Sequence, residues 1–235
     1  MKRLKVLVVI ALILLIPGCT DFFMICSLNP FYIDKDVTTV HEVEGVWKAF
    51  PLHPRKVEKF PVWKQADTTY AWKIERVISK EKRKNKEGKE YVYLIPSNIY
   101  MVTLTGKHSD SLIYQFNMVL FRVNKMLYAD FMPVDNTGLN KSRFAMESYF
   151  SVHTLARVIV RKNQLSFSWL GADYMKGMIE NKRVRINYTW VQSARRLLLT
   201  ATSEQLTGMI ERYAGETRFI DWDNQQTMLK LNRIK

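Results

Sequence analysis

The chain holds few residues whose types and spacing support catalysis or metal binding. Its histidines are isolated from one another and from the cysteines, so none has a partner at the spacing of a metal site. They are His41, His53, His108 and His153. A phosphate loop ending in Gly106-Lys107 would need a glycine where Met101 stands, and no Gly-x-Ser-x-Gly motif occurs. We therefore expect neither a metal nor a cofactor.

Two residues stay open as members of a polar site. His153 is expected at a strand end near the mouth of a barrel, and Asp130 lies between Ala129 and Phe131 in an apolar segment. The simpler interpretation is structural: a hydrogen-bonded histidine, and an aspartate that binds turn amides or a nearby basic residue. The alternative is an enzyme of the envelope whose site is assembled from dispersed residues near His153 and Asp130.

Cys19 offers a different chemistry, because it stands at the end of a segment with the pattern of an export signal. Three basic residues within the first five positions precede an uninterrupted apolar run over residues 6–16, which Pro17-Gly18-Cys19 closes. An apolar helix of this length rises about 16 Å, against a hydrocarbon core of about 30 Å. The pattern predicts a signal peptide over residues 1–18 and an exported chain.

The residues around this cysteine carry a resemblance. Leu15-Ile16-Pro17-Gly18-Cys19 resembles the lipobox of bacterial lipoproteins, with Pro17 where that family usually has a small or aliphatic residue. The resemblance implies that the Cys19 thiol takes a diacylglycerol, that the chain is cut before it, and that the new amine can take a third acyl chain. Each buried methylene contributes about 0.8 kcal/mol, so such chains would hold the protein on a membrane.

This resemblance predicts a lipid-anchored tether over residues 19–30 and a place in the bacterial cell envelope. In a Gram-negative organism the anchor would lie in the outer membrane and face the periplasm. Ordinary secretion and an uncleaved helix over residues 6–28 are the alternatives, and the helix would bury Asp21 at a cost of about 3 kcal/mol. If Cys19 is acylated, Cys26 has no cysteine partner; otherwise a short Cys19–Cys26 disulfide is the alternative.

Composition and charge limit the classes of partner. The net charge is +14, and loss of the three basic residues in the signal lowers it to +11, which favours an anionic partner. Residues 20–33 contain no Lys or Arg, so the charge is not a membrane clamp next to the anchor. No nucleic-acid motif occurs, and we expect no nucleic-acid partner.

Hydrophobic patterning predicts a mainly β domain over residues 31–235. Residues 70–78 alternate apolar and polar side chains, which predicts a strand. Residues 80–90 contain six basic and three acidic residues, and residues 91–95 follow them as the returning strand. This predicts a hairpin with a basic, solvated tip, which is either a wet loop or a docking site for anionic lipid or polymer. Further strands are expected over residues 99–105, 112–123, 126–132, 155–161, 165–170, 183–190, 196–201 and 228–234.

Two short helices interrupt the strands. Residues 172–181 carry apolar side chains at helical spacing and are expected to cap the barrel. Thr202-Ser203-Glu204-Gln205 matches a capping box, and the apolar stripe after it predicts a second helix. The predicted fold is an antiparallel barrel or strongly curved sheet with two short helices.

Three segments resemble a poorly characterised family of bacterial lipoproteins. They are Asn29-Pro30-Phe31-Tyr32 with Gly45-x-Trp47, the hairpin of residues 120–133, and residues 198–206. Gly45-x-Trp47 is also similar to the first strand of lipocalin-like barrels. That resemblance implies that an arginine of the last strand, Arg233, stacks on Trp47 and closes the barrel.

These observations favour a non-catalytic ligand-binding or protein-interaction module. Its expected partners are the membrane, through acyl chains on Cys19, and a small apolar ligand or an anionic component of the envelope. Aromatic residues, 12% of the chain, would line an apolar pocket.

Overall fold

The computed structural model describes seven stretches of the chain. They are residues 24–49, 71–84, 90–105, 112–134, 152–191, 196–213 and 228–234. The predicted signal peptide and Cys19 lie outside these residues. Among the helices that are described, none combines the length and the apolar character needed to cross a membrane.

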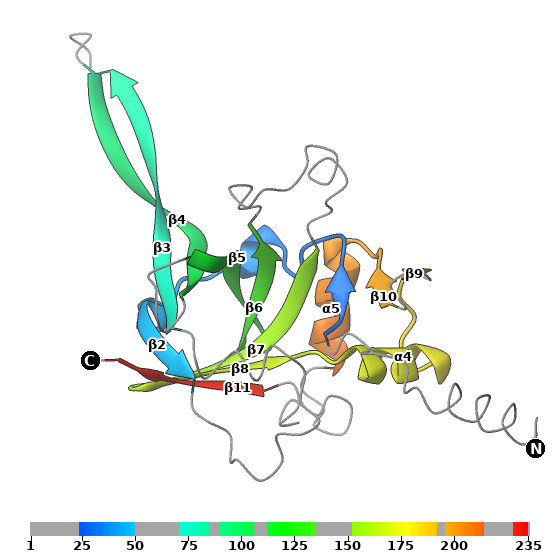
Figure 1. Cartoon of the computed structure of the whole chain (residues 1–235). Helices are drawn as coiled ribbons and strands as arrows, with labels where there is room; N and C mark the ends of the chain where they lie inside the picture. The colour runs from blue at the N-terminus through cyan, green and yellow to red at the C-terminus, as the bar shows by residue number, and fades with distance from the viewer. Residues whose placement is uncertain are drawn as a thin grey trace, which may run out of the picture.

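Eight antiparallel strands form a closed barrel (Figure 1). Each strand pairs with the next in the order β2-β3-β4-β5-β6-β7-β8-β11, and β11 pairs with β2 to complete the ring. The strands are β2 (Gly45–Ala49), β3 (Ala71–Lys84), β4 (Glu90–Thr105), β5 (Leu112–Val123), β6 (Met126–Pro133), β7 (His153–Arg161), β8 (Gln164–Trp169) and β11 (Met228–Arg233). The predicted fold class, a lipocalin-like antiparallel barrel with two short helices, is confirmed.

Alternation along each strand separates the barrel interior from its outer wall. On β6, Leu127, Ala129 and Phe131 belong to the interior cluster, whereas Tyr128 between them packs in a second cluster outside the barrel. β7 follows the same rule, with Ala156 and Val158 inside. The wall formed by β5, β6 and β7 is therefore apolar on both faces, and its outer face needs a cover.

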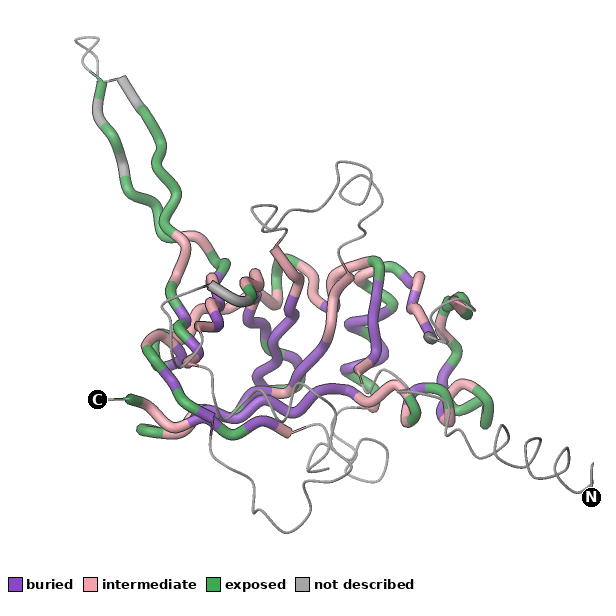
Figure 2. Tube along the Cα trace, in the orientation of Figure 1, coloured by how far each residue is buried: buried purple, intermediate pink, exposed green. Residues whose placement is uncertain are grey.

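Two helices and a small sheet provide that cover (Figures 1 and 2). The elements are β1 (Cys26–Ser27), α4 (Ala172–Glu180), β9 (Tyr188–Val191), β10 (Arg196–Leu199) and α5 (Ser203–Tyr213); two 3-10 turns, η1 (Asp34–Asp36) and η2 (His41–Val43), precede β2. Helix α5 buries Leu206, Met209 and Ile210, which recur at helical spacing.

The helix starts and ends only partly follow the sequence predictions. The capping box of α5 is confirmed, because the Thr202 amide donates to Gln205 Oε1 at 3.1 Å and the Gln205 amide donates to Thr202 Oγ1 at 3.4 Å. Helix α4 forms where expected, but its buried side chains, Met175 and Met178, belong to the outer cluster and not to the barrel interior. It covers the small sheet and does not cap the barrel. Of the strand predicted over residues 183–190, only Tyr188–Val191 forms.

The structure also changes the predicted boundary between tether and domain. Residues 24–30 were expected in the tether, yet Ile25 is fully buried and β1 pairs with both β7 and β10. Asn29 Nδ2 donates to the Ala201 carbonyl at 2.8 Å, which fixes the end of this segment. A short apolar stretch can be shielded from water by lipid or by protein, and here the side chains of the second cluster shield it. Residues 24–30 are therefore part of the folded domain.

The hairpin of β3 and β4 is longer than predicted. Strand pairing continues to Lys84 and Glu90, so residues 80–84 are strand, although a loop from Lys80 was expected. The register changes between Arg76 and Ile78, and beyond this point the hairpin leaves the barrel with exposed residues (Figures 1 and 2). Arg76 Nε donates to the Ser97 carbonyl at 2.6 Å, which ties the two strands together at this irregularity.

Candidate functional site

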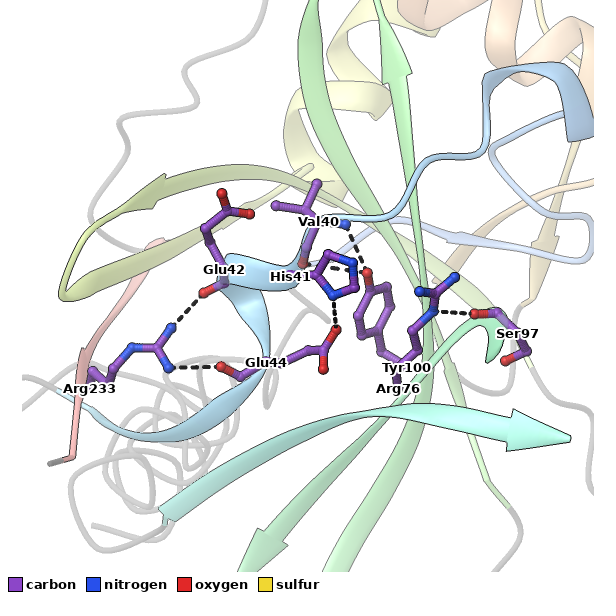
Figure 3. Close-up of polar contacts among 8 residues, drawn as sticks. All are labelled: Val40, His41, Glu42, Glu44, Arg76, Ser97, Tyr100 and Arg233. Carbon is purple, nitrogen blue, oxygen red and sulfur yellow. Dashed lines mark hydrogen bonds and ion pairs between the residues drawn. The ribbon is translucent and has the colours of Figure 1, made fainter. Parts of the chain in front are cut away.

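The structure brings Trp47 and Arg233 together where the first and last barrel strands pair. β2 and β11 align Trp47 with Arg233, and the guanidinium carbon lies 4.3 Å from the centre of the indole ring. Arg233 Nη1 donates to the Glu44 carbonyl at 2.8 Å and Nη2 donates to the Glu42 carbonyl at 2.7 Å (Figure 3). One side chain thus stacks on an aromatic face and satisfies two backbone acceptors.

Gly45 is required by this arrangement. Its φ is +135°, a conformation that other residues rarely adopt, and a Cβ there would lie 2.5 Å from Arg233 Nη1. The Trp47 indole in turn donates to the Val43 carbonyl at 2.8 Å, so the turn η2 is held from both sides. The Gly-x-Trp motif therefore has a physical basis in the position of the arginine.

Tyr100 fixes the other end of the same segment. Its hydroxyl accepts a hydrogen bond from the Val40 amide at 2.8 Å (Figure 3). The tyrosine is buried, and burial is the main reason why its pKa is raised above the usual value, with the Val40 contact acting in the opposite direction. Residues 40–44 are thereby pinned across one end of the barrel by Tyr100 and Arg233.

Aromatic side chains occupy the barrel interior. The Phe167 ring lies 5.2 Å from Phe131, 5.8 Å from Trp169 and 6.3 Å from Trp72, measured between ring centres. Trp47 and Phe167 are fully buried. Rings at these separations are in contact, so an apolar ligand in the centre would have to displace them.

A basic groove lies beside the closed end of the barrel. It has a volume of about 650 Å³ and is lined by residues 39, 40 and 42, by the turn between β5 and β6, and by the end of β7 with the turn that follows. Five of its lining residues are cationic, and Glu42 is the one carboxylate among them. The cationic residues, called the groove cations below, are Arg122, Lys125, Arg157, Arg161 and Lys162.

Asp130 and His153 also meet, on the outer wall of the barrel. Asp130 Oδ1 lies 2.7 Å from His153 Nδ1, and Asp130 Oδ2 accepts the Phe31 amide at 2.7 Å. Asp130 is 2% exposed, so its carboxylate is satisfied inside the second cluster. It also adds to the raised pKa of the Tyr32 hydroxyl, of which burial is the larger cause. The aspartate joins the N-terminal segment to the start of β7.

The outer part of the β3–β4 hairpin has one face that is both apolar and basic. The pairs Ile78–Pro96, Lys80–Leu94 and Lys82–Val92 face each other across the strands at alternate positions, so all six residues lie on one face. Leu94 is 62% exposed, Val92 57% and Ile78 56%. We call these six residues the hairpin face.

Sequence reasoning found some of these features and missed others. It named Trp47, Arg233, Asp130 and His153, which the structure brings together as two pairs, and Cys19 lies outside the described residues. It missed the groove cations, because they come from two hairpins that meet only when β6 pairs with β7. Their signal was the recurrence of basic residues at the ends of predicted strands. Within the described residues, no three His, Cys, Asp or Glu side chains gather as a metal site requires.

Comparison of the chain with protein-family models, with curated proteins and with solved structures gave no match.

The closed end of the barrel predicts that alanine substitutions at two glycines have opposite effects on the stability of the protein. Gly45→Ala should destabilise the protein by about 2 kcal/mol or more, because the methyl group meets Arg233 and the backbone is strained. Gly177→Ala, whose Cβ would meet nothing within 4 Å inside α4, should stabilise it by about 0.5–1 kcal/mol. Urea unfolding measures both, and equal effects at the two positions would show that Gly45 has no special role.

Proposed function

We propose that this chain is a lipid-anchored protein of the bacterial cell envelope that works as a non-catalytic interaction module. It contacts an anionic lipid surface through the outer part of the β3–β4 hairpin. The observation that carries this proposal is the hairpin face, which leaves large apolar side chains exposed next to lysines. No element of the described chain covers this surface, and a partner outside the chain would explain its exposure.

The filled interior supports an interaction role over a carrier role. The aromatic rings around Phe167 contact one another where a lipocalin-like carrier would hold its ligand. This removes the main reason to favour a small apolar ligand inside the barrel. Recognition is then left to outer surfaces, and the hairpin is the element that extends farthest from the barrel (Figure 1).

The hairpin face has the chemistry of an interfacial surface. The side chains of Lys80 and Lys82 form no ion pair or hydrogen bond in the described part of the chain, and each stands opposite an exposed apolar residue. Ammonium groups at the level of lipid phosphates, with Leu94 and Val92 among the acyl chains, would satisfy both kinds of side chain. These features favour an anionic lipid surface as the partner.

The lipid anchor is compatible with the position of the first described residue. Residues 20–23 separate Cys19 from Met24, which is bridged to Gly171 beside α4. The five steps from Cys19 to Met24 span at most about 18 Å, so acyl chains on Cys19 would hold the domain close to its membrane. Figure 1 shows the hairpin leaving the barrel on the side away from β1, which extends the reach of the protein beyond its attachment point.

Acylation predicts a specific mass. In the membrane fraction, the intact protein should lack residues 1–18 and carry the added mass of two or three acyl chains, as the lipobox resemblance implies. Cys19→Ala should abolish that addition and the membrane partitioning, whereas Cys26→Ala should leave both unchanged, because Cys26 is buried in β1. Identical mass and partitioning for Cys19→Ala and the unaltered chain would refute the anchor.

Contact with lipid predicts a local fluorescence change. A polarity-sensitive dye on Leu94→Cys, in a Cys19→Ser background, should shift to the blue with phosphatidylglycerol vesicles and not with phosphatidylcholine vesicles. The same dye on Tyr188→Cys, an exposed position on β9, should not shift. Lys80→Glu with Lys82→Glu should remove the shift, while Lys48→Glu with Lys230→Glu, at exposed barrel positions, should retain most of it.

Two results would contradict contact through the hairpin face. One is a shift that survives the change of charge at Lys80 and Lys82. The other is an equal shift at positions 94 and 188.

The pairing of Asp130 with His153 favours a second candidate function, an envelope hydrolase. A carboxylate on Nδ1 orients an imidazole so that Nε2 can act as a general base, and the His153 side chain is 13% exposed. This candidate predicts ester hydrolysis that falls at least about 100-fold in His153→Gln, by the usual contribution of a general base. Absence of turnover by the unaltered chain on a panel of nitrophenyl esters would leave Asp130 and His153 a structural pair.

A further inference from the structure

We propose that the basic groove at the closed end of the barrel binds a phosphorylated ligand. This site is separate from the hairpin face, and it does not depend on the lipid anchor. The groove has a volume of about 650 Å³, which is in the usual range for small-molecule sites.

The charge of the groove is far from balanced. The five groove cations face the single carboxylate of Glu42. The side chains of Arg122, Lys125, Arg161 and Lys162 form no ion pair or hydrogen bond in the described part of the chain, whereas Arg157 has an interaction of its own. Like charges gathered around one concave surface repel each other, and an anion with two or more charges would relieve this repulsion.

The fold explains why these residues converge. Asn124 and Lys125 both have positive φ, at 49° and 66°, which is the geometry of a tight hairpin turn between β5 and β6. Across that turn Arg122 pairs with Leu127, and Leu127 pairs with Val158 on β7. The two hairpins therefore bring Arg122 and Lys125 next to the end of β7, whose residues 157–162 also line the groove.

The donor types indicate phosphate as the anion. Three of the groove cations are arginines, whose planar guanidinium groups bind two phosphate oxygens at once. Arg157 is half-buried and has an interaction of its own, whereas Arg122, Arg161 and Lys162 are exposed around the groove. Several exposed cations around one groove are suited to a compact, multiply charged group.

Most of the other lining residues are apolar, and they affect whether the phosphate would be free or part of a lipid. Val40, Leu127 and Val158 line the groove beside the cations. These side chains could accommodate a free phosphate. They could also accommodate a phosphate attached to a small apolar group, such as the glycerol and first acyl carbons of a lipid. The shared chemistry is the phosphate, and the two sources make different predictions for affinity.

Calorimetric titration of the full chain distinguishes these cases. Pyrophosphate should bind with 1:1 stoichiometry at an ionic strength held constant with chloride. Arg122→Gln with Arg161→Gln should weaken binding by at least about 100-fold, because two charge-assisted hydrogen bonds to the anion are lost. Arg185→Gln with Arg212→Gln, which changes two exposed arginines outside the groove, should leave the affinity within about twofold.

Dihexanoyl phosphatidic acid, used below its micelle concentration, tests the source. Tighter binding than pyrophosphate would assign the ligand to lipid headgroups, and equal or weaker binding would assign it to free phosphorylated compounds. No saturable binding of either probe at millimolar concentration would overturn the proposal. Equal affinity in the groove variant and the unaltered chain would overturn it as well, and neither result bears on the hairpin face.

Discussion

The stacking of Arg233 on Trp47 is the interaction on which the closed barrel depends. Two strands far apart in the sequence meet there, and the arginine also holds the carbonyls of residues 42 and 44. Hydrogen bonds that involve a charged group contribute about 1.5–3 kcal/mol each, and the bond to the Glu44 carbonyl is the more buried of the two. The side chain therefore joins β2, β11 and the turn η2 at one point, and the absence of a side chain at position 45 makes room for it.

This closure also shapes the outer surface of the barrel. The segment pinned by Tyr100 and Arg233 crosses the barrel end, and residues 39, 40 and 42 of the same segment form one wall of the basic groove. The interior is filled with aromatic rings that supply stability, and the basic groove lies at the fixed end, where Leu127 and Val158 of the interior cluster also line it. The hairpin is a second exposed surface at a distance from this one. The barrel would then support both of the contacts proposed above.

The sequence was sufficient to predict the parts of the fold that depend on local pattern. Alternation defined β5 to its last residue, the capping box defined the start of α5, and the similarity to lipocalin-like barrels paired Trp47 with Arg233. Residues 24–30 were assigned wrongly to the tether, because an apolar segment has the same pattern whether lipid or protein covers it. The groove cations were not predicted as a group, since they converge through pairing between β6 and β7 that no local pattern contains.

The claim that the basic groove at the closed end of the barrel is an anion site is tested most directly by mapping it in solution. Backbone amide and methyl NMR spectra recorded during a pyrophosphate titration should change around residues 39–42, 122–127 and 157–162. The methyl groups of the interior, such as those of Leu165, should stay in place, because the closed barrel does not open. Changes centred on the interior or around Asp130 and His153, with the groove unaffected, would contradict the account.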